Sequence, residues 1–145
     1  MLRFIRSHKR KTPKKRRKTS SPVVWEKAYD VEKKVKVILK KLNSDIDSTN
    51  IYYYRSYYSK SRAYARIWGL SRLWQMALKV KPSYIIEVLS QHFDKLESYE
   101  KDRVILHELA HIPKNFSGGL LPHIRKRGKR NFHDRVIGLI EKYSE

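Results

Sequence analysis

Residues 104–123 read VILHELAHIPKNFSGGLLPH, and this stretch decides which fold we expect. It contains the pattern H-E-x-x-H as His107, Glu108 and His111. On a helix, residues four positions apart project from the same face, so both imidazoles can reach one metal ion. Glu108 follows the first histidine directly, where a carboxylate can act as a general base towards water. The pattern therefore predicts a zinc hydrolase site with Glu108 as its catalytic base.

The residues around the motif are those that a buried metal-binding helix requires. Its neighbours carry no charge; they are Val104, Ile105, Leu109, Ala110 and Ile112. Pro113 disfavours helix at the residue before it, so the helix should end just beyond His111.

A catalytic zinc site needs a third protein ligand and an open position. The chain contains no cysteine, so this ligand must be a histidine or a carboxylate. His123 is favoured because Gly118-Gly119 permits a sharp reversal of the chain after His111. His133 is the alternative third ligand, and Glu141 is a more distant choice. A hydrolase also needs a group that stabilises the oxyanion. The candidates are Tyr143, Arg135 and His133, and the spacing of the sequence favours none of them.

The charge of the chain points to a polyanionic partner. The sequence has 34 Lys and Arg against 14 Asp and Glu, a net charge of +20 with a pI of about 10.2. Ten of the first 20 residues are Lys or Arg, and a second basic run occupies residues 125–130. Charge of this kind is typical of nucleic-acid-binding proteins. The predicted contacts are Arg3, Arg6, Lys9, Arg10, Lys11, Lys14, Lys15, Arg16, Arg17, Lys18, Arg125, Lys126, Arg127, Lys129 and Arg130.

Other classes of protein are disfavoured. No run approaches the roughly 18 apolar residues of a membrane span, and the basic N-terminus lacks the apolar core of a secretory signal. The basic extension also lacks the amphipathic face that inserts into a membrane surface. We therefore expect a cytoplasmic protein that does not bind membranes.

The chain divides into a basic extension, residues 1–21, and one domain, residues 22–145. Apolar spacing predicts a helix over about 22–42, with Ser21 as its N-cap and Pro22 at its first position. Strand-type runs follow at 51–58, within 62–80 and at 81–90. A helix should begin near Ser98 and carry the motif, and Asn131 should cap a last helix. This order predicts an α+β domain with a small sheet packed on helices.

The stretch DKLESYEKDRVILHELAHIPKNFSGGLLPH, preceded by PSYIIEVLS, resembles the phage-type metallopeptidase family, whose members also occur in archaea and share an H-E-L-x-H-I-P motif. The resemblance covers about residues 62–143. It implies a minimal zincin fold, with His107, His111 and His123 as zinc ligands and Glu108 as the base. It further implies that YIIEVLS is the edge strand along which a peptide substrate could bind by strand addition.

Residues 1–21 are instead similar to the basic extensions of ribosomal proteins, which thread between rRNA helices and contact phosphates. Within residues 52–62, tyrosines beside Arg55, Lys60 and Arg62 suit base stacking, although they are equally suited to a strand core. We thus expect a ribosome-associated, rRNA-binding protein of archaeal type, built on a zinc metallopeptidase-like domain. The alternative is a zinc protease that depends on nucleic acid and cleaves proteins bound to DNA or RNA. A third hypothesis is a toxin-like or regulatory metallopeptidase, but no feature of the sequence points to it.

Overall fold

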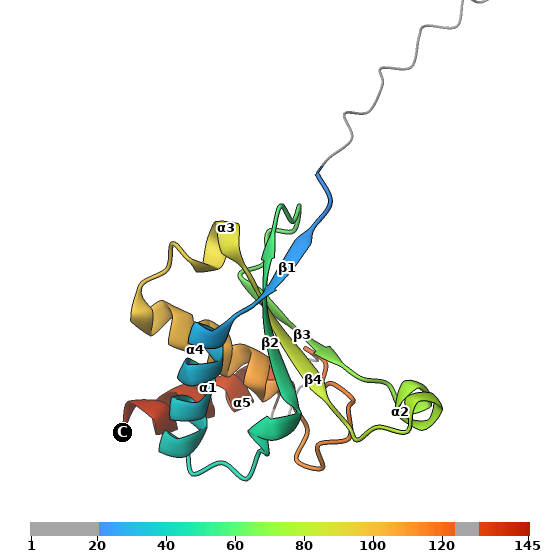
Figure 1. The fold of residues 1–145 in the computed structure, drawn as a ribbon. Helices are drawn as coiled ribbons and strands as arrows, with labels where there is room; N and C mark the ends of the chain where they lie inside the picture. The colour runs from blue at the N-terminus through green and yellow to red at the C-terminus, as the bar shows by residue number, and fades with distance from the viewer. Residues whose placement is uncertain (1–20, 124–130) are drawn as a thin grey trace, which may run out of the picture.

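A four-stranded mixed sheet organises the computed structural model, which describes residues 21–123 and 131–145 (Figure 1). The strands follow the spatial order β1-β2-β4-β3. β2 and β4 are parallel, whereas β1 pairs with β2 and β3 pairs with β4 in antiparallel register. The bounds are β1 (Val24–Lys27), β2 (Ile51–Tyr57), β3 (Ala65–Gly69) and β4 (Tyr84–Leu89).

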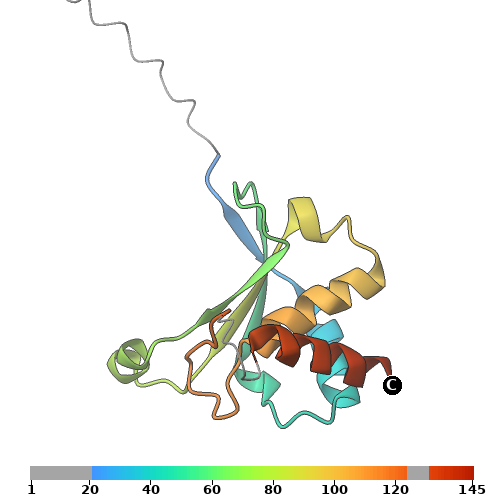
Figure 2. The same cartoon turned by 180° about the vertical axis from the view of Figure 1, so that it is seen from behind.

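Three longer helices lie together on one side of this sheet (Figures 1 and 2). They are α1 (Tyr29–Lys41), α4 (Ser98–Ala110) and α5 (Phe132–Ser144). The core forms where their apolar stripes meet the sheet, with Val35 of α1, Ile105 of α4 and Ile86 of β4 fully buried. The prediction of an α+β, zincin-like domain is therefore confirmed.

The shorter elements connect these layers. A 3-10 turn, η1 (Ser48–Asn50), leads into β2, and α3 (Ser90–Phe93) follows β4. The remaining helix, α2 (Arg72–Leu78), projects away from the sheet between β3 and β4, and none of its residues is buried. None of the helices in the described ranges is long and apolar enough to span a membrane.

Local capping explains where the two helices near the motif begin. The side chain of Glu97 and that of Glu100 complete a capping box at the start of α4. Asn131 caps α5, as predicted, because its side chain accepts a hydrogen bond from the backbone N–H of Asp134 at 3.0 Å. Both starts satisfy backbone donors that have no partner within the helix.

The predicted helix over 22–42 was wrong in its first part. Residues Val24–Lys27 form a strand, and α1 begins only at Tyr29. Strand β1 pairs with the edge of β2, with Trp25 opposite Ser56. This long-range pairing satisfies the backbone hydrogen bonds of the segment. It outweighs the helical spacing of the apolar residues, because Trp25 is more than half exposed and does not join the core.

The expectations between residues 51 and 90 were partly confirmed. β2, β3 and β4 lie where strand-type runs were predicted, but residues 72–78 form α2 rather than a second strand. The edge strand was also assigned wrongly, since β4 is flanked by β2 and β3 and is therefore central. The strand at the edge of the sheet beside α4 is β3. The basic residues predicted to contact nucleic acid in 3–18 and 125–130 lie outside the described ranges.

Candidate metal centre

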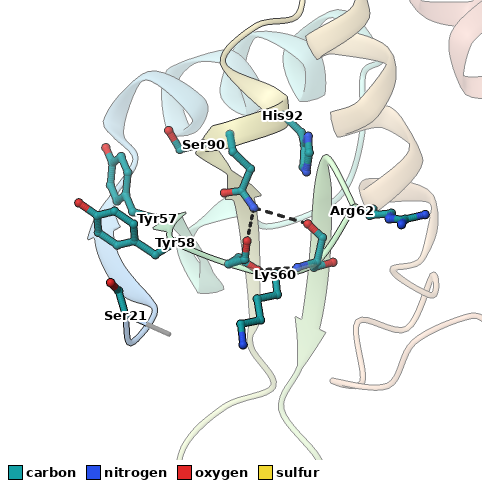
Figure 3. A pocket seen from close by; sticks show the side chains of 10 residues that line it. Ser21, Tyr57, Tyr58, Lys60, Arg62, Ser90 and His92 are labelled. Atoms are coloured by element: carbon teal, nitrogen blue, oxygen red, sulfur yellow. Dashed lines mark hydrogen bonds between the residues drawn. The ribbon is translucent and has the colours of Figure 1, made fainter. Parts of the chain in front are cut away.

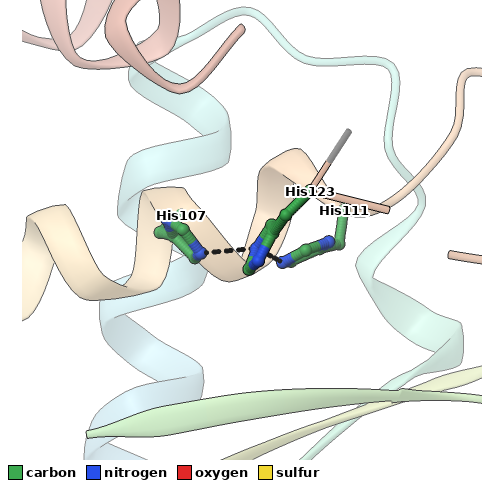
Figure 4. Close-up of side chains that lie close together, drawn as sticks. All are labelled: His107, His111 and His123. Carbon is green, nitrogen blue, oxygen red and sulfur yellow. Dashed lines mark hydrogen bonds between the residues drawn. The ribbon is translucent and has the colours of Figure 1, made fainter. Parts of the chain in front are cut away.

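The three histidines singled out by the sequence lie together at the end of α4 (Figure 4). His107 lies in the last full turn of this helix, and His111 is its C-terminal cap residue. His123 approaches from the segment that returns along the helix. Its Nε2 atom lies 3.1 Å from Nε2 of His107 and 2.8 Å from Nε2 of His111. One potential ligand atom of each ring therefore faces a common point.

The segment that carries His123 is tied back to α4 by its own backbone. The N–H of Leu121 donates to the carbonyl of His111 at 2.8 Å, and the carbonyl of Leu121 accepts from Nδ1 of His111 at 2.6 Å. Because Nδ1 carries the proton in this arrangement, Nε2 of His111 presents a lone pair to the cluster.

The loop before Leu121 is anchored to the sheet through Tyr84. The Tyr84 hydroxyl accepts from the N–H of Gly118 and donates to the carbonyl of Gly119, each at 2.9 Å. Gly118 has a φ of 88°, a conformation that favours glycine. Gly69 at the end of β3 permits the close approach, because a Cβ there would lie 2.1 Å from the carbonyl oxygen of Gly118. The Gly-Gly reversal expected from the sequence thus depends also on a third glycine, Gly69 in β3.

The donor set fits zinc. A tetrahedral ion with Zn–N bonds of about 2.0–2.1 Å separates its donors by roughly 3.3 Å. The two Nε2 separations of 3.1 and 2.8 Å are slightly shorter than this, and the ligand atoms of all three rings lie within 4.8 Å of one another, so the cluster has about the size of a zinc site. Burial lowers the pKa of His107 to about 4, and the neighbouring His111 and His123 add to the effect. Burial lowers the pKa of His111 too. Neutral imidazole is the form that binds a metal ion.

Phe132, the first residue of α5, closes one side of the cluster. Its ring stacks on His111 at a centroid distance of 4.2 Å and an interplanar angle of 26°. It also meets His107 at 5.2 Å and His123 at 4.6 Å. No pattern in the sequence singles out Phe132 for this site. Its position directly after a helix N-cap was the one available signal, and that signal does not indicate what the ring contacts.

Glu108 lies on the sheet side of the histidines and is buried. Burial raises the pKa of its carboxyl group to about 7, opposed in part by a hydrogen bond from the backbone of Ile67 in β3. That hydrogen bond places the carboxylate beside the edge of the sheet. A carboxyl group that titrates near neutral pH can both accept and donate a proton there.

A cleft of about 440 Å³ opens beside Glu108 and His107. Its walls come from the start of β3, from α4 and from α5, and they include Tyr64, Arg103 and His133. His133 therefore lines the cleft, while His123 completes the histidine cluster. The assignment of the zinc ligands and of the base stays a prediction for which this geometry is favourable.

The two other residues considered for an oxyanion site have different partners. Nε of Arg135 donates to the carbonyl of Ala110 at 2.8 Å, and its Nη2 donates to the carbonyl of Ile112 at 2.9 Å. Arg135 thus caps the C-terminal end of α4, where a positive charge is favourable. The hydroxyl of Tyr143 donates to Asp102 at 2.9 Å. Neither Arg135 nor Tyr143 lines the cleft.

Comparison with known proteins agrees with this site. Residues 23–139 match the family described as "Putative phage metallopeptidase". No curated protein and no solved structure matches the chain. The match takes in the whole sheet, α4 with its histidines, His123 and most of α5. The chain belongs to the Putative phage metallopeptidase family.

Proposed function

We propose that this protein is a zinc-dependent peptidase in which His107, His111 and His123 hold the metal and Glu108 is the general base. The observation that carries the proposal is the buried carboxyl group of Glu108, which lines the cleft directly beside the histidine cluster. When bound, zinc supplies a Lewis acid and lowers the pKa of water.

Glu108 then performs the proton transfers. Burial raises the pKa of Glu108 to about 7 in the metal-free protein. The ionised carboxylate can take a proton from the attacking water. The resulting carboxylic acid can donate that proton to the amine that leaves.

The edge of β3 supports a peptide as the substrate. β3 pairs with the sheet on one side only, and its Ile67 backbone reaches Glu108. An extended peptide that adds to this edge would pass along the cleft. His133 lines the same cleft and is the candidate for a donor to the oxyanion, because Arg135 and Tyr143 are engaged elsewhere.

The test compares Glu108→Gln with Glu141→Gln, which replaces an exposed carboxylate on α5. Zinc content is measured by atomic absorption and turnover with a library of quenched fluorescent peptides. We expect both variants to keep the zinc of the wild type, while Glu108→Gln loses at least about 10²-fold in kcat/KM and Glu141→Gln loses nothing. A zinc-loaded wild type that cleaves no peptide, or a fully active Glu108→Gln variant, would overturn the proposal.

A second proposal concerns the partner, and its support is the net charge of +20, half of which lies in residues 1–20. We propose that the protein associates with ribosomal RNA through phosphate contacts. Sucrose-gradient sedimentation of a cell extract at moderate salt should place it with a ribosomal subunit. Sedimentation away from ribosomes, with co-purifying DNA, would favour the alternative of a protease that acts on DNA-bound proteins.

A further inference from the structure

The side of the sheet opposite α1, α4 and α5 carries three rows of side chains. The strand register places Trp25, Ser56 and Leu89 in the first row and Tyr52, Ile85 and Trp68 in the third. The middle row consists of Lys27, Tyr54, Glu87 and Arg66. We call these rows the open face. Three of its aromatic side chains are about half exposed: Trp25 at 57%, Tyr52 at 51% and Trp68 at 50%.

The only acidic residue of the open face is withdrawn from solvent. Glu87 is 1% exposed and accepts hydrogen bonds from Nε1 of Trp25 at 3.1 Å and from Nε1 of Trp68 at 2.7 Å. Arg66 donates to the same carboxylate through Nε at 2.9 Å. These bonds lower the pKa of Glu87 although its burial would raise it. Glu87 therefore holds both indoles in fixed positions and adds no exposed negative charge.

The exposed side chains of the open face are aromatic and cationic apart from Ile85, which is 38% exposed. Lys27 is exposed in the middle row, and the guanidinium of Arg66 lies 5.4 Å from the centroid of the Trp68 ring. Such a surface repels a basic partner, because its described residues offer no exposed carboxylate with which an arginine or a lysine could pair. It suits an anionic partner with flat rings, since base and aromatic faces stack without regard to sequence.

We propose that the open face binds single-stranded nucleic acid, with unpaired bases stacked on Trp25, Tyr52 and Trp68. This inference rests on the proposal that the protein associates with nucleic acid and says where the bases lie. Neighbouring strands are about 4.8 Å apart, so the sheet is roughly 14 Å wide from β1 to β3. The indoles of Trp25 and Trp68 both reach inward to the carboxylate of Glu87, so the two rings lie closer together than their strands. A four-stranded sheet of this width can stack two or three bases. A duplex keeps its bases stacked on each other and cannot use the rings.

A pocket at the end of β2 offers a place for the phosphates (Figure 3). It has a volume of about 630 Å³, and its walls include Lys60, Arg62 and His92 but no carboxylate. Tyr58 adds a further exposed ring. Ser21 also lines the pocket, so the segment with ten Lys and Arg among 20 residues joins the described chain at this point. Phosphates bound here would continue the path of a strand whose bases lie on the open face.

The first experiment tests the rings. Binding of a fluorescein-labelled oligouridine of about 12 nucleotides is compared with binding of a duplex of equal length. Tyr52→Ala and Trp25→Ala should each lower affinity for the single strand about tenfold and leave duplex affinity unchanged. The matched control is Trp74→Ala, which removes a similarly exposed indole (59%) from α2, outside the three rows. It should bind like the wild type.

Two features keep the result interpretable. Tyr52 makes no side-chain hydrogen bond to the described residues, so Tyr52→Ala should fold even if Trp25→Ala, which frees one acceptor of Glu87, is less stable. Stacking is not an ionic contact, so these variants should keep the slope of log affinity against log salt. Repeating the titration with oligothymidine separates RNA from DNA as the preferred strand.

The second experiment tests the pocket. Lys60→Gln and Arg62→Gln should each weaken binding and lower the salt slope by about 1. Lys33→Gln, which neutralises an exposed lysine of α1, is the control and should leave the slope unchanged.

The outcomes separate this proposal from the one on which it rests. A wild-type protein that binds neither probe would overturn nucleic-acid association itself. Equal binding to single strand and duplex, with Tyr52→Ala and Trp25→Ala unaffected, would refute the open face and leave association standing. Loss of peptide turnover in these two variants, with nucleic-acid binding intact, would instead assign the face to a protein partner.

Discussion

Leu121 is hydrogen-bonded to His111 through both of its backbone polar groups, at 2.8 Å from N–H to carbonyl and at 2.6 Å from carbonyl to Nδ1. This pair fixes the ring orientation of one histidine and the path of the chain that ends in another, His123. The third ligand position therefore depends on how the loop between them is anchored, and not only on the spacing of histidines.

Removing one hydroxyl group should loosen the loop. Tyr84→Phe deprives the N–H of Gly118 and the carbonyl of Gly119 of their buried partner. We expect the free energy of unfolding to fall by about 1–3 kcal/mol and zinc affinity to fall about tenfold, as measured by urea denaturation and isothermal calorimetry. Tyr143→Phe is the control, because its hydroxyl contacts Asp102 and not the loop. An unchanged zinc affinity in Tyr84→Phe would show that the loop is held by other contacts.

Replacing Gly69 or Gly138 by alanine should change the stability of the protein in opposite directions. In Gly69→Ala the new Cβ would lie 2.1 Å from the carbonyl oxygen of Gly118, so the loop must shift, and we expect a loss of about 1–3 kcal/mol with weaker zinc binding. In Gly138→Ala, on α5, the Cβ meets nothing within 4 Å. That variant should gain roughly 0.5–1 kcal/mol in helix stability and keep its zinc affinity. Thermal melts with and without zinc measure both effects.

Glu108 should lower the stability of the metal-free protein at neutral pH and above. Its pKa is about 7 in the folded state against an ordinary value of 4.5. Between these values the folded state holds a proton that the unfolded chain has released, so the free energy of unfolding decreases as pH rises, by roughly 3 kcal/mol in total.

Glu108→Gln abolishes this pH dependence, so the metal-free variant should be more stable than the wild type at pH 8 and about equal to it near pH 4. The opposite effect of His107, whose pKa is lowered to about 4, is common to both proteins and cancels in the difference. Denaturant titrations across this pH range measure the difference. A constant difference between variant and wild type at all pH values would contradict the raised pKa.

The choice of the third ligand can be settled by zinc-dependent stability. Zinc at about 1,000 times its Kd should add roughly 4 kcal/mol to the free energy of unfolding, and a chelator should remove that gain. His123→Ala should lose the zinc-dependent rise in Tm, whereas His133→Ala should retain it. If the turnover of His133→Ala falls while its zinc content is unchanged, His133 acts in the cleft. The reverse pattern would make His133 the ligand.

Local rules account for the parts of the fold that the sequence predicted well. The apolar stripe of Val31, Val35 and Ile38 marks α1, and the Asn131 cap marks the start of α5, because both depend on residues within one or two helical turns. The same holds for the pair His107 and His111, since one helical turn separates them in any helix.

Only the tertiary structure decided the features that join distant segments. Residues 24–27 became a strand because the edge of β2 accepts their backbone hydrogen bonds, and β3 rather than β4 became the edge beside Glu108. The tertiary structure also decided that His123 meets the helical pair, that Phe132 covers all three rings and that Gly69 admits the loop. Periodicity and capping are set by near neighbours, so the sequence by itself determined the helix and its motif. Strand order and loop anchorage depend on contacts between residues far apart in the sequence, from 15 to 33 positions within the sheet and 35 between Tyr84 and Gly119, and no local pattern contains that information.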